Sequence, residues 1–135
     1  MIKDSIACIV VRNDTVLIGK RIREGQMGGR WEFPGGKVEP GETLEQAVVR
    51  EFAEEFSVPV CVGELIAEAE FTHNGTAITL HAFHVHIAAE TPAWQLTEHT
   101  EIKWVPFAAI PSLRFVDSDM LIYPAVRAYF EGAAE

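Results

Sequence analysis

The sequence has little positive charge, no long apolar run and only two cysteines. Lys and Arg number 11 against 20 Asp and Glu, so the formal net charge is −9 at pH 7. This balance argues against a nucleic-acid partner, because nucleic-acid backbones bind to basic surfaces. No stretch approaches the ~20 apolar residues of a membrane-spanning helix, and none resembles the core of a signal peptide. We therefore expect a cytoplasmic monomer with no membrane partner.

The two cysteines, Cys8 and Cys61, lie in the apolar stretches "IACIVV" and "PVCVGEL". Their spacing matches no zinc or redox motif, so we interpret both as small buried hydrophobic residues. The overall composition, 48% hydrophobic and 23% charged, is that of a globular protein. The length of 135 residues favours one domain, residues 1–135, with a buried core.

Apolar runs separated by turn residues predict a structure rich in strands. Residues 5–11 and 15–21 are β-branched runs joined by "RNDT", which favours a hairpin. A longer hairpin is predicted over residues 60–88, because Asn74-Gly75 is a strong two-residue turn signal. A short strand is expected over residues 101–106.

Glycine and proline interrupt the regular pattern in three places. Residues 23–30 are polar and glycine-rich, which predicts a loop. Residues 31–42 contain two prolines and three glycines, so we expect no regular structure there. Residues 107–113 predict a loop or a short helical turn.

The first predicted helix covers residues 43–57. Its apolar stripe recurs at four-residue intervals, as Leu44, Val48, Phe52 and Phe56. Thr43 and Gln46 form the pattern of a capping box at its start, and Pro59 enforces its end.

The second predicted helix covers residues 118–132, with Ser118 or Asp117 as its cap and Gly132 at its end. Pro124 falls inside this stretch, so we expect a kink or a delayed start. Two helices among many strands predict an α+β fold.

The stretch "REFAEEF" at residues 50–56 gathers three glutamates on one helix. Spacings of three and four bring Glu51, Glu54 and Glu55 onto one face, where like charges repel by a few tenths of a kcal/mol per pair. Such a face is either merely solvated or built around a cation. Arg50 can orient one of these carboxylates through its fork of donors.

Oxygen ligands of this kind suit a hard divalent cation, Mg²⁺ in the first place and Mn²⁺ as a substitute. Glycines 35 and 36 allow a sharp turn that leaves a backbone carbonyl free to point at the metal. The face, the glycine turn and the capped helix together favour a metal site over a solvated surface.

The spacing of these residues resembles the Nudix box. Gly36 is followed after five residues by Glu42, and after seven more by "REFAEEFSV". The preceding "WEFPGG" resembles the MutT branch of the family, while Ser57 stands where the family has a glycine. The resemblance implies a Nudix fold, which is an α/β/α sandwich around a mixed β-sheet. It also implies Mg²⁺-dependent hydrolysis of a nucleoside triphosphate to the monophosphate and pyrophosphate.

The resemblance implies catalytic roles for named residues. Mg²⁺ would be held by Glu51, Glu54, Glu55 and the Gly35 carbonyl. A glutamate outside the box, Glu98, would serve as a further ligand or as the base, with Glu101 as its rival. The general base is either Glu51 or Glu98, and Arg50 assists by orienting a carboxylate.

Four residues are candidates for substrate binding by the same resemblance. Arg21 matches a position that contacts the substrate, although a strand-end surface charge would look the same. Glu32 and Phe33 would flank the base and sugar. Asp119 aligns with an asparagine that reads the base, although it would also serve as a plain helix cap.

The ionisation of Asp119 would decide which base it accepts. An ionised carboxylate only accepts hydrogen bonds, so it favours an amino group such as cytosine N4 and a CTP or dCTP substrate. A protonated Asp119 would also donate, which would admit 8-oxo-dGTP.

Two other functions stay open from the sequence. One is hydrolysis of ADP-ribose or dinucleoside polyphosphates, and the other is a non-catalytic nucleotide-binding module. Histidines 81, 84 and 86 allow a zinc site, but packing and hydrogen bonding are the commoner roles of histidines on a half-buried strand.

Overall fold

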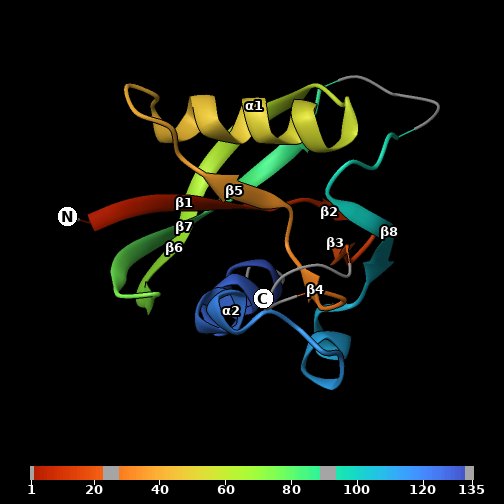
Figure 1. Ribbon diagram of the computed structural model, residues 1–135. Coiled ribbons are helices and arrows are strands. Elements are labelled where there is room, and N and C mark those ends of the chain that lie inside the picture. The colour runs from red at the N-terminus through yellow and green to blue at the C-terminus, as the bar shows by residue number, and fades with distance from the viewer. Residues whose placement is uncertain (1, 23–27, 89–93, 133–135) are drawn as a thin grey trace.

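The computed structural model describes residues 2–22, 28–88 and 94–132, and over these residues the chain forms two four-stranded sheets and two α-helices (Figure 1). The first sheet has the strand order β5-β1-β7-β6. Its strands are β1 (Ile2–Ile9), β5 (Gly35–Lys37), β6 (Val60–His73) and β7 (Thr76–Ile87). In the second sheet β3 pairs with each of the other three strands, which makes it the centre. Its strands are β2 (Val11–Arg12), β3 (Thr15–Arg21), β4 (Trp31–Glu32) and β8 (His99–Val105).

The first sheet is mixed and lies between the two helices. β1 and β7 run parallel, while the β1–β5 and β6–β7 pairs are antiparallel. Figure 1 shows α1 (Leu44–Phe56) on one side of this sheet and α2 (Asp117–Gly132) on the other. The predicted α/β/α sandwich around a mixed sheet is therefore confirmed. No helix in the described ranges is both long and apolar enough to cross a membrane.

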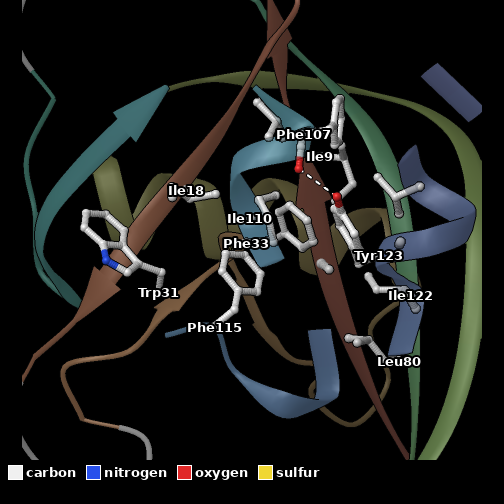
Figure 2. Packing of buried hydrophobic residues seen from close by; sticks show 14 residues of the cluster. Ile9, Ile18, Trp31, Phe33, Leu80, Phe107, Ile110, Phe115, Ile122 and Tyr123 are labelled. Atoms are coloured by element: carbon white, nitrogen blue, oxygen red, sulfur yellow. Dashed lines mark hydrogen bonds between the residues drawn. The ribbon is translucent and has the colours of Figure 1, made fainter. Parts of the chain in front are cut away.

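Each face of the first sheet has its own core, because successive side chains of β1 point in opposite directions. Ile6 and Cys8 pack with Phe52 and Phe56 under α1. The other face packs against α2 in the cluster of Figure 2, whose members include Ile9, Ile18, Phe33, Ile122 and Tyr123. In that cluster the Tyr123 hydroxyl donates to the Phe107 carbonyl at 2.7 Å.

The first predicted hairpin was only partly correct. The turn at Asn13 and Asp14, both with positive φ, joins β2 to β3. Residues 2–9, however, leave that hairpin and pair with β7 in the other sheet. An apolar run carries no sign of where it is divided between two sheets, because apolar and β-branched residues favour a strand in either sheet.

The prediction that residues 31–42 lack regular structure was wrong, since β4 and β5 both form there. Gly35 and Gly36 pair with Ala7 and Ile6 of β1. A Cβ added at Gly35 would lie 2.0 Å from the Ile6 carbonyl oxygen. Glycine is therefore needed for close strand approach as well as for chain reversal. Of the loop predicted over 23–30, residues 23–27 lie outside the described residues.

The second hairpin, the strand near residues 101–106 and the short helical turn are confirmed. Asn74 and Gly75, both with positive φ, connect β6 to β7. β8 covers His99–Val105, and η1 (Phe107–Ser112) is a 3₁₀ helix. Of the two cysteines, Cys8 is buried as predicted, but Cys61 is exposed.

Both helices form as predicted, with one correction. At the start of α1 the Gln46 N–H donates to Thr43 Oγ1 at 3.0 Å, and the Thr43 N–H donates to the Gln46 side chain at 2.9 Å. α2 begins at Asp117 and continues through Pro124, so the proline does not delay its start. Asp117 and Ser118, the two predicted caps, therefore lie inside the first turn of the helix.

We predict that Ser57→Gly raises the free energy of unfolding by about 1 kcal/mol, because Ser57 ends α1 in the left-handed conformation, with φ 58°. Urea unfolding at pH 7 measures the change. Ser57→Ala is the control, since it removes the 3.3 Å contact of the hydroxyl with Gln95 but keeps the Cβ. Equal stabilities of the glycine and alanine variants would show that the backbone conformation carries no strain.

Candidate active site

Arg50 joins four carboxylates at the exposed face of α1. Its Nε and one terminal nitrogen contact the two oxygens of Glu42 at 2.7 and 2.9 Å. Its other terminal nitrogen donates to Glu51 at 2.8 Å and to Glu54 at 3.1 Å, and Glu39 lies 3.2 Å from Nε. A single guanidinium thus holds several like charges in a fixed arrangement.

Arg50 has two further effects, one on the pKa of Glu42 and one on the position of α1 relative to β5. The guanidinium lowers the pKa of Glu42 to about 2, and Glu42 raises the pKa of Arg50 in return. Arg50 also donates to the carbonyl oxygen of Lys37 at 2.9 Å, which ties α1 to the end of β5.

Glu51 lies against β5 at the edge of the first sheet. A Cβ added at Gly36 would lie 2.5 Å from the Glu51 carboxyl carbon, so only glycine leaves room for this carboxylate. Burial raises the pKa of Glu51, and the contact with Arg50 opposes the rise. Glu51 is thereby held at the boundary between the helix and the strand.

Glu55 is the most deeply buried acid of this group, with 2% of its surface exposed. Burial raises its pKa to about 9, with further increases from Glu51 and Glu32, while a backbone hydrogen bond from Gly35 opposes the rise. Its Oε2 is buried without a hydrogen-bond partner. An unpaired buried carboxylate oxygen costs free energy that a cation would recover, so the donor set fits a hard divalent metal.

Glu98 is brought to the same face by the segment that precedes β8. Thr97 bonds the end of α1, its N–H donating to the Glu55 carbonyl at 3.3 Å and its hydroxyl to the Glu54 carbonyl at 2.9 Å. Glu98 is exposed, and its charge helps to raise the pKa of both Glu51 and Glu55. Its rival Glu101 lies in β8 and is paired with Lys20 of the neighbouring strand β3.

A cavity of about 800 Å³ adjoins this acidic face. Its wall includes all four residues proposed to bind the substrate, together with both glycines of β5: Arg21, Glu32, Phe33, Gly35, Gly36 and Asp119. Arg21 forms an ion pair with Glu32 at 3.0 Å, and its side chain is 42% exposed. β5 therefore separates the acids on α1 from the cavity and borders both.

Asp119 is buried in this wall, where its Oδ2 accepts a 2.9 Å hydrogen bond from the Phe33 N–H. Burial raises its pKa to about 8, with a contribution from Glu32, while the Phe33 N–H and Arg21 oppose the rise. The raised pKa favours a neutral Asp119, which is the second of the two alternatives left open by the sequence.

One residue of the site, His99, was missed by the sequence reasoning. Its Nε2 lies 2.9 Å from Glu32, and atoms of Glu32, Glu55 and His99 lie within 4.8 Å of one another. Its position directly after Glu98, at the start of a strand, was the available signal.

The three histidines considered for zinc have structural contacts instead. His81 bonds Glu68 and, at 2.8 Å, Asp4. The rings of His84 and His86 lie 4.1 Å apart. Within the described ranges none of the three belongs to a group of metal-ligating side chains.

Comparison with known proteins places this geometry in a family. The NUDIX domain model matches residues 1–125. The CTP pyrophosphohydrolase of Escherichia coli (strain K12) is 39% identical over 99 residues, which are 73% of this chain and 72% of that protein. The 8-oxo-dGTP diphosphatase of the same organism is 40% identical over 82 residues, 59% of this chain and 64% of that protein.

The fold agrees with these matches. The solution structure of the E. coli ORF135 protein superimposes with a TM-score of 0.82 at 31% identity, covering 94% of this chain and 89% of that one. Nudix enzymes use divalent metal ions, which agrees with the group of metal-ligating side chains around Glu55. The chain belongs to the Nudix family and is a hydrolase of its MutT-like branch.

Proposed function

We propose that this chain is a Mg²⁺-dependent nucleoside triphosphate pyrophosphohydrolase, with Mn²⁺ as a substitute metal. Its substrates are CTP or dCTP, or oxidised nucleotides such as 8-oxo-dGTP, and its products are the monophosphate and pyrophosphate. The observation that carries the proposal is the shared border at β5, where the Arg50 cluster of acids meets the cavity. The activities named for the two E. coli relatives support the same chemistry.

The metal-binding role falls to the acids of α1. Glu51, Glu54, Glu55 and the Gly35 carbonyl would hold Mg²⁺, with Glu98 on the facing segment as a further ligand. Bound there, Mg²⁺ supplies positive charge for the phosphates and lowers the pKa of a coordinated water. Arg50 keeps Glu51 and Glu54 in place at 2.8 and 3.1 Å, so the carboxylates need no rearrangement before binding.

The proton of the attacking water has two candidate acceptors, Glu51 and Glu98. Glu51 already accepts a hydrogen bond from Arg50 through Oε1, which leaves Oε2 as the oxygen that can bind a metal or accept a proton. Glu98 is exposed and sits on a tethered segment beside the same face. We favour Glu98 as the base and Glu51 as a ligand.

The cavity gives each part of a nucleotide a partner. Arg21 offers positive charge to the phosphates beside β5. The Phe33 ring is 2% exposed and packs against Phe115 in the core, so the predicted contact of this ring with the base is not available and Phe33 supports the site by its N–H bond to Asp119. Asp119 has its Oδ2 engaged by Phe33, so Oδ1 is the oxygen available to the base edge. A neutral carboxyl would donate from Oδ1 to O6 of an oxidised guanine, whereas the ionised form would accept from cytosine N4.

Removal of the metal tests the reaction class. We expect excess chelator to abolish pyrophosphate release from CTP, dCTP and 8-oxo-dGTP, and added Mg²⁺ or Mn²⁺ to restore it, because phosphate charge is otherwise uncompensated. ADP-ribose and a dinucleoside polyphosphate complete the substrate panel, with a buffer blank. Because these two substrates release no pyrophosphate, their turnover is measured by chromatography of the nucleotide products. Turnover that persists in chelator would contradict the metal mechanism, and faster turnover of ADP-ribose would contradict the substrate class.

We predict that Glu54→Gln and Glu55→Gln each lower kcat by about 10²-fold, because each removes a ligand charge. Glu45→Gln is the matched control, since it makes the same change at an exposed position in the first turn of α1. Steady-state kinetics at saturating Mg²⁺ measures the effect. Near-normal kcat in both variants would mean that this face is only solvated.

Glu55→Gln also has a predicted effect on stability without metal. The pKa of Glu55 is raised from 4.5 to about 9, so the wild-type protein loses stability as the pH rises between these values. Glutamine cannot ionise, so the variant should lose less free energy of unfolding over this range.

We predict that the base preference of the wild-type enzyme changes with pH, because the pKa of Asp119 is about 8. The ratio of kcat/KM for 8-oxo-dGTP over dCTP should fall between pH 7 and pH 9, as Oδ1 loses its proton. One hydrogen bond of about 1–3 kcal/mol corresponds to a change of roughly tenfold or more.

Asp119→Asn provides the control, because its amide keeps a donor at every pH. Its ratio should stay constant and close to the wild-type value at pH 7. Taking a ratio of two substrates in one buffer cancels effects of pH on metal binding. A pH-dependent ratio in the asparagine variant would show that Asp119 does not read the base.

A further inference from the structure

His99 holds the carboxylate that in turn holds Arg21 at the cavity wall. The side chain of His99 is 0% exposed, and its Nε2 lies 2.9 Å from Glu32 Oε2. The other oxygen of Glu32 accepts from Arg21 at 3.0 Å. Because a carboxylate shared with a guanidinium is an acceptor, the histidine nitrogen facing it carries the proton. Glu32 is thus held by His99 on one side and by Arg21 on the other, and its contact with Arg21 keeps the guanidinium at the cavity wall.

Three neighbouring strands make this contact possible, with a glycine between the two side chains. His99 begins β8, Glu32 ends β4, and Gly19 of the intervening β3 pairs with Glu32. A Cβ added at Gly19 would lie 2.6–2.8 Å from atoms of the His99 ring. The imidazole therefore lies over a strand position that has no side chain and reaches across β3 to Glu32.

The same ring also contacts the helix that carries the metal-binding acids. His99 stacks on Phe56, the last residue of α1, with centroids 5.6 Å apart and planes 10° apart. Thr97, two residues earlier, bonds the Glu54 and Glu55 carbonyls. One short segment thus fixes the acidic face and the cavity wall relative to each other.

We propose that His99 is a positioning residue for substrate binding, which orients Glu32 and through it fixes Arg21 toward the phosphates of the nucleotide. This inference rests on the proposed function, because it assigns the phosphates to Arg21. Loss of the Nε2–H donor frees Glu32 to rotate, so Arg21 loses its fixed position and the substrate binds more weakly. The chemistry at the acids of α1 is not directly affected.

A metal-ligand role for His99 is the competing explanation, since Glu55 and Glu32 are close. It is disfavoured because Nε2 is already engaged by Glu32. The two explanations differ in what they predict for metal dependence. A ligand role changes the Mg²⁺ concentration for half-maximal activity, whereas a positioning role changes the KM for the nucleotide.

The test compares four variants by steady-state kinetics with dCTP and 8-oxo-dGTP, at saturating and at varied Mg²⁺. His99→Phe keeps a flat ring without a donor, and His99→Gln replaces the Nε2–H donor with an amide. Gly19→Ala keeps the histidine at position 99 but displaces its ring, because the added Cβ would overlap with it. His81→Phe is the matched control, because it removes another buried histidine that bonds two carboxylates and does not line the cavity.

We expect His99→Phe and Gly19→Ala to raise KM about tenfold with a smaller change in kcat and an unchanged half-saturating Mg²⁺ concentration. His99→Gln should recover most of the affinity. His81→Phe should lower the thermal unfolding temperature without changing KM. Thermal unfolding of every variant identifies any that does not fold, and Gly19→Ala tests the proposal if His99→Phe is one of them.

Three results would overturn the inference. They are an unchanged KM in a folded His99→Phe or Gly19→Ala variant, a raised Mg²⁺ requirement in His99→Phe, and a glutamine variant as weak as the phenylalanine one. Wild-type protein that releases no pyrophosphate from any triphosphate would instead overturn the proposed function, so the two failures are distinct.

Discussion

The guanidinium of Arg50 is the contact on which the rest of the site depends. It binds Glu42, Glu51 and Glu54 within 3.1 Å and so keeps mutually repelling carboxylates on one face. Lysine could not replace it, because an ammonium lacks the planar fork of donors that serves several carboxylates at once. Its bond to the Lys37 carbonyl attaches this arrangement to β5, and β5 connects it to the sheet. The acids proposed to bind the metal are thereby held together by the protein alone.

Two glycine contacts explain how the acids come so close to the strands. At Gly36 the Glu51 carboxylate occupies the space of a side chain, and at Gly35 the backbone approaches Ile6. Gly19 plays the same part in the other sheet, where it makes room for the His99 ring. At Gly36 and Gly19 the missing Cβ lets a functional side chain lie directly on the backbone, and at Gly35 it lets two strands approach closely. The site is thus compact at the cost of some chain entropy.

Burial divides the acids of the site into different protonation states. Glu42, paired with Arg50, has a pKa of about 2, whereas Glu55 and Asp119 have pKa values raised to about 9 and about 8. The raised values store unfavourable desolvation that a bound cation would relieve at Glu55. At Asp119 the same effect keeps a donor available near neutral pH. Neighbouring carboxylates in one site thus have different chemistry because their surroundings differ.

The sequence by itself determined the features that depend on near neighbours along the chain. The capping box of α1, the turn at Asn74-Gly75 and the common face of Glu51, Glu54 and Glu55 all follow from spacings of a few residues. The spacing of the Nudix box predicted the cluster of acids around Arg50 for the same reason. Only the tertiary structure decided that residues 2–12 are shared between two sheets. It also decided the contacts of His99 with Glu32, 67 residues apart, and of Phe33 with Asp119, 86 residues apart. These pairs meet because strands and helices from distant parts of the chain pack together, and the burial that raises the pKa of Asp119 exists only after that packing.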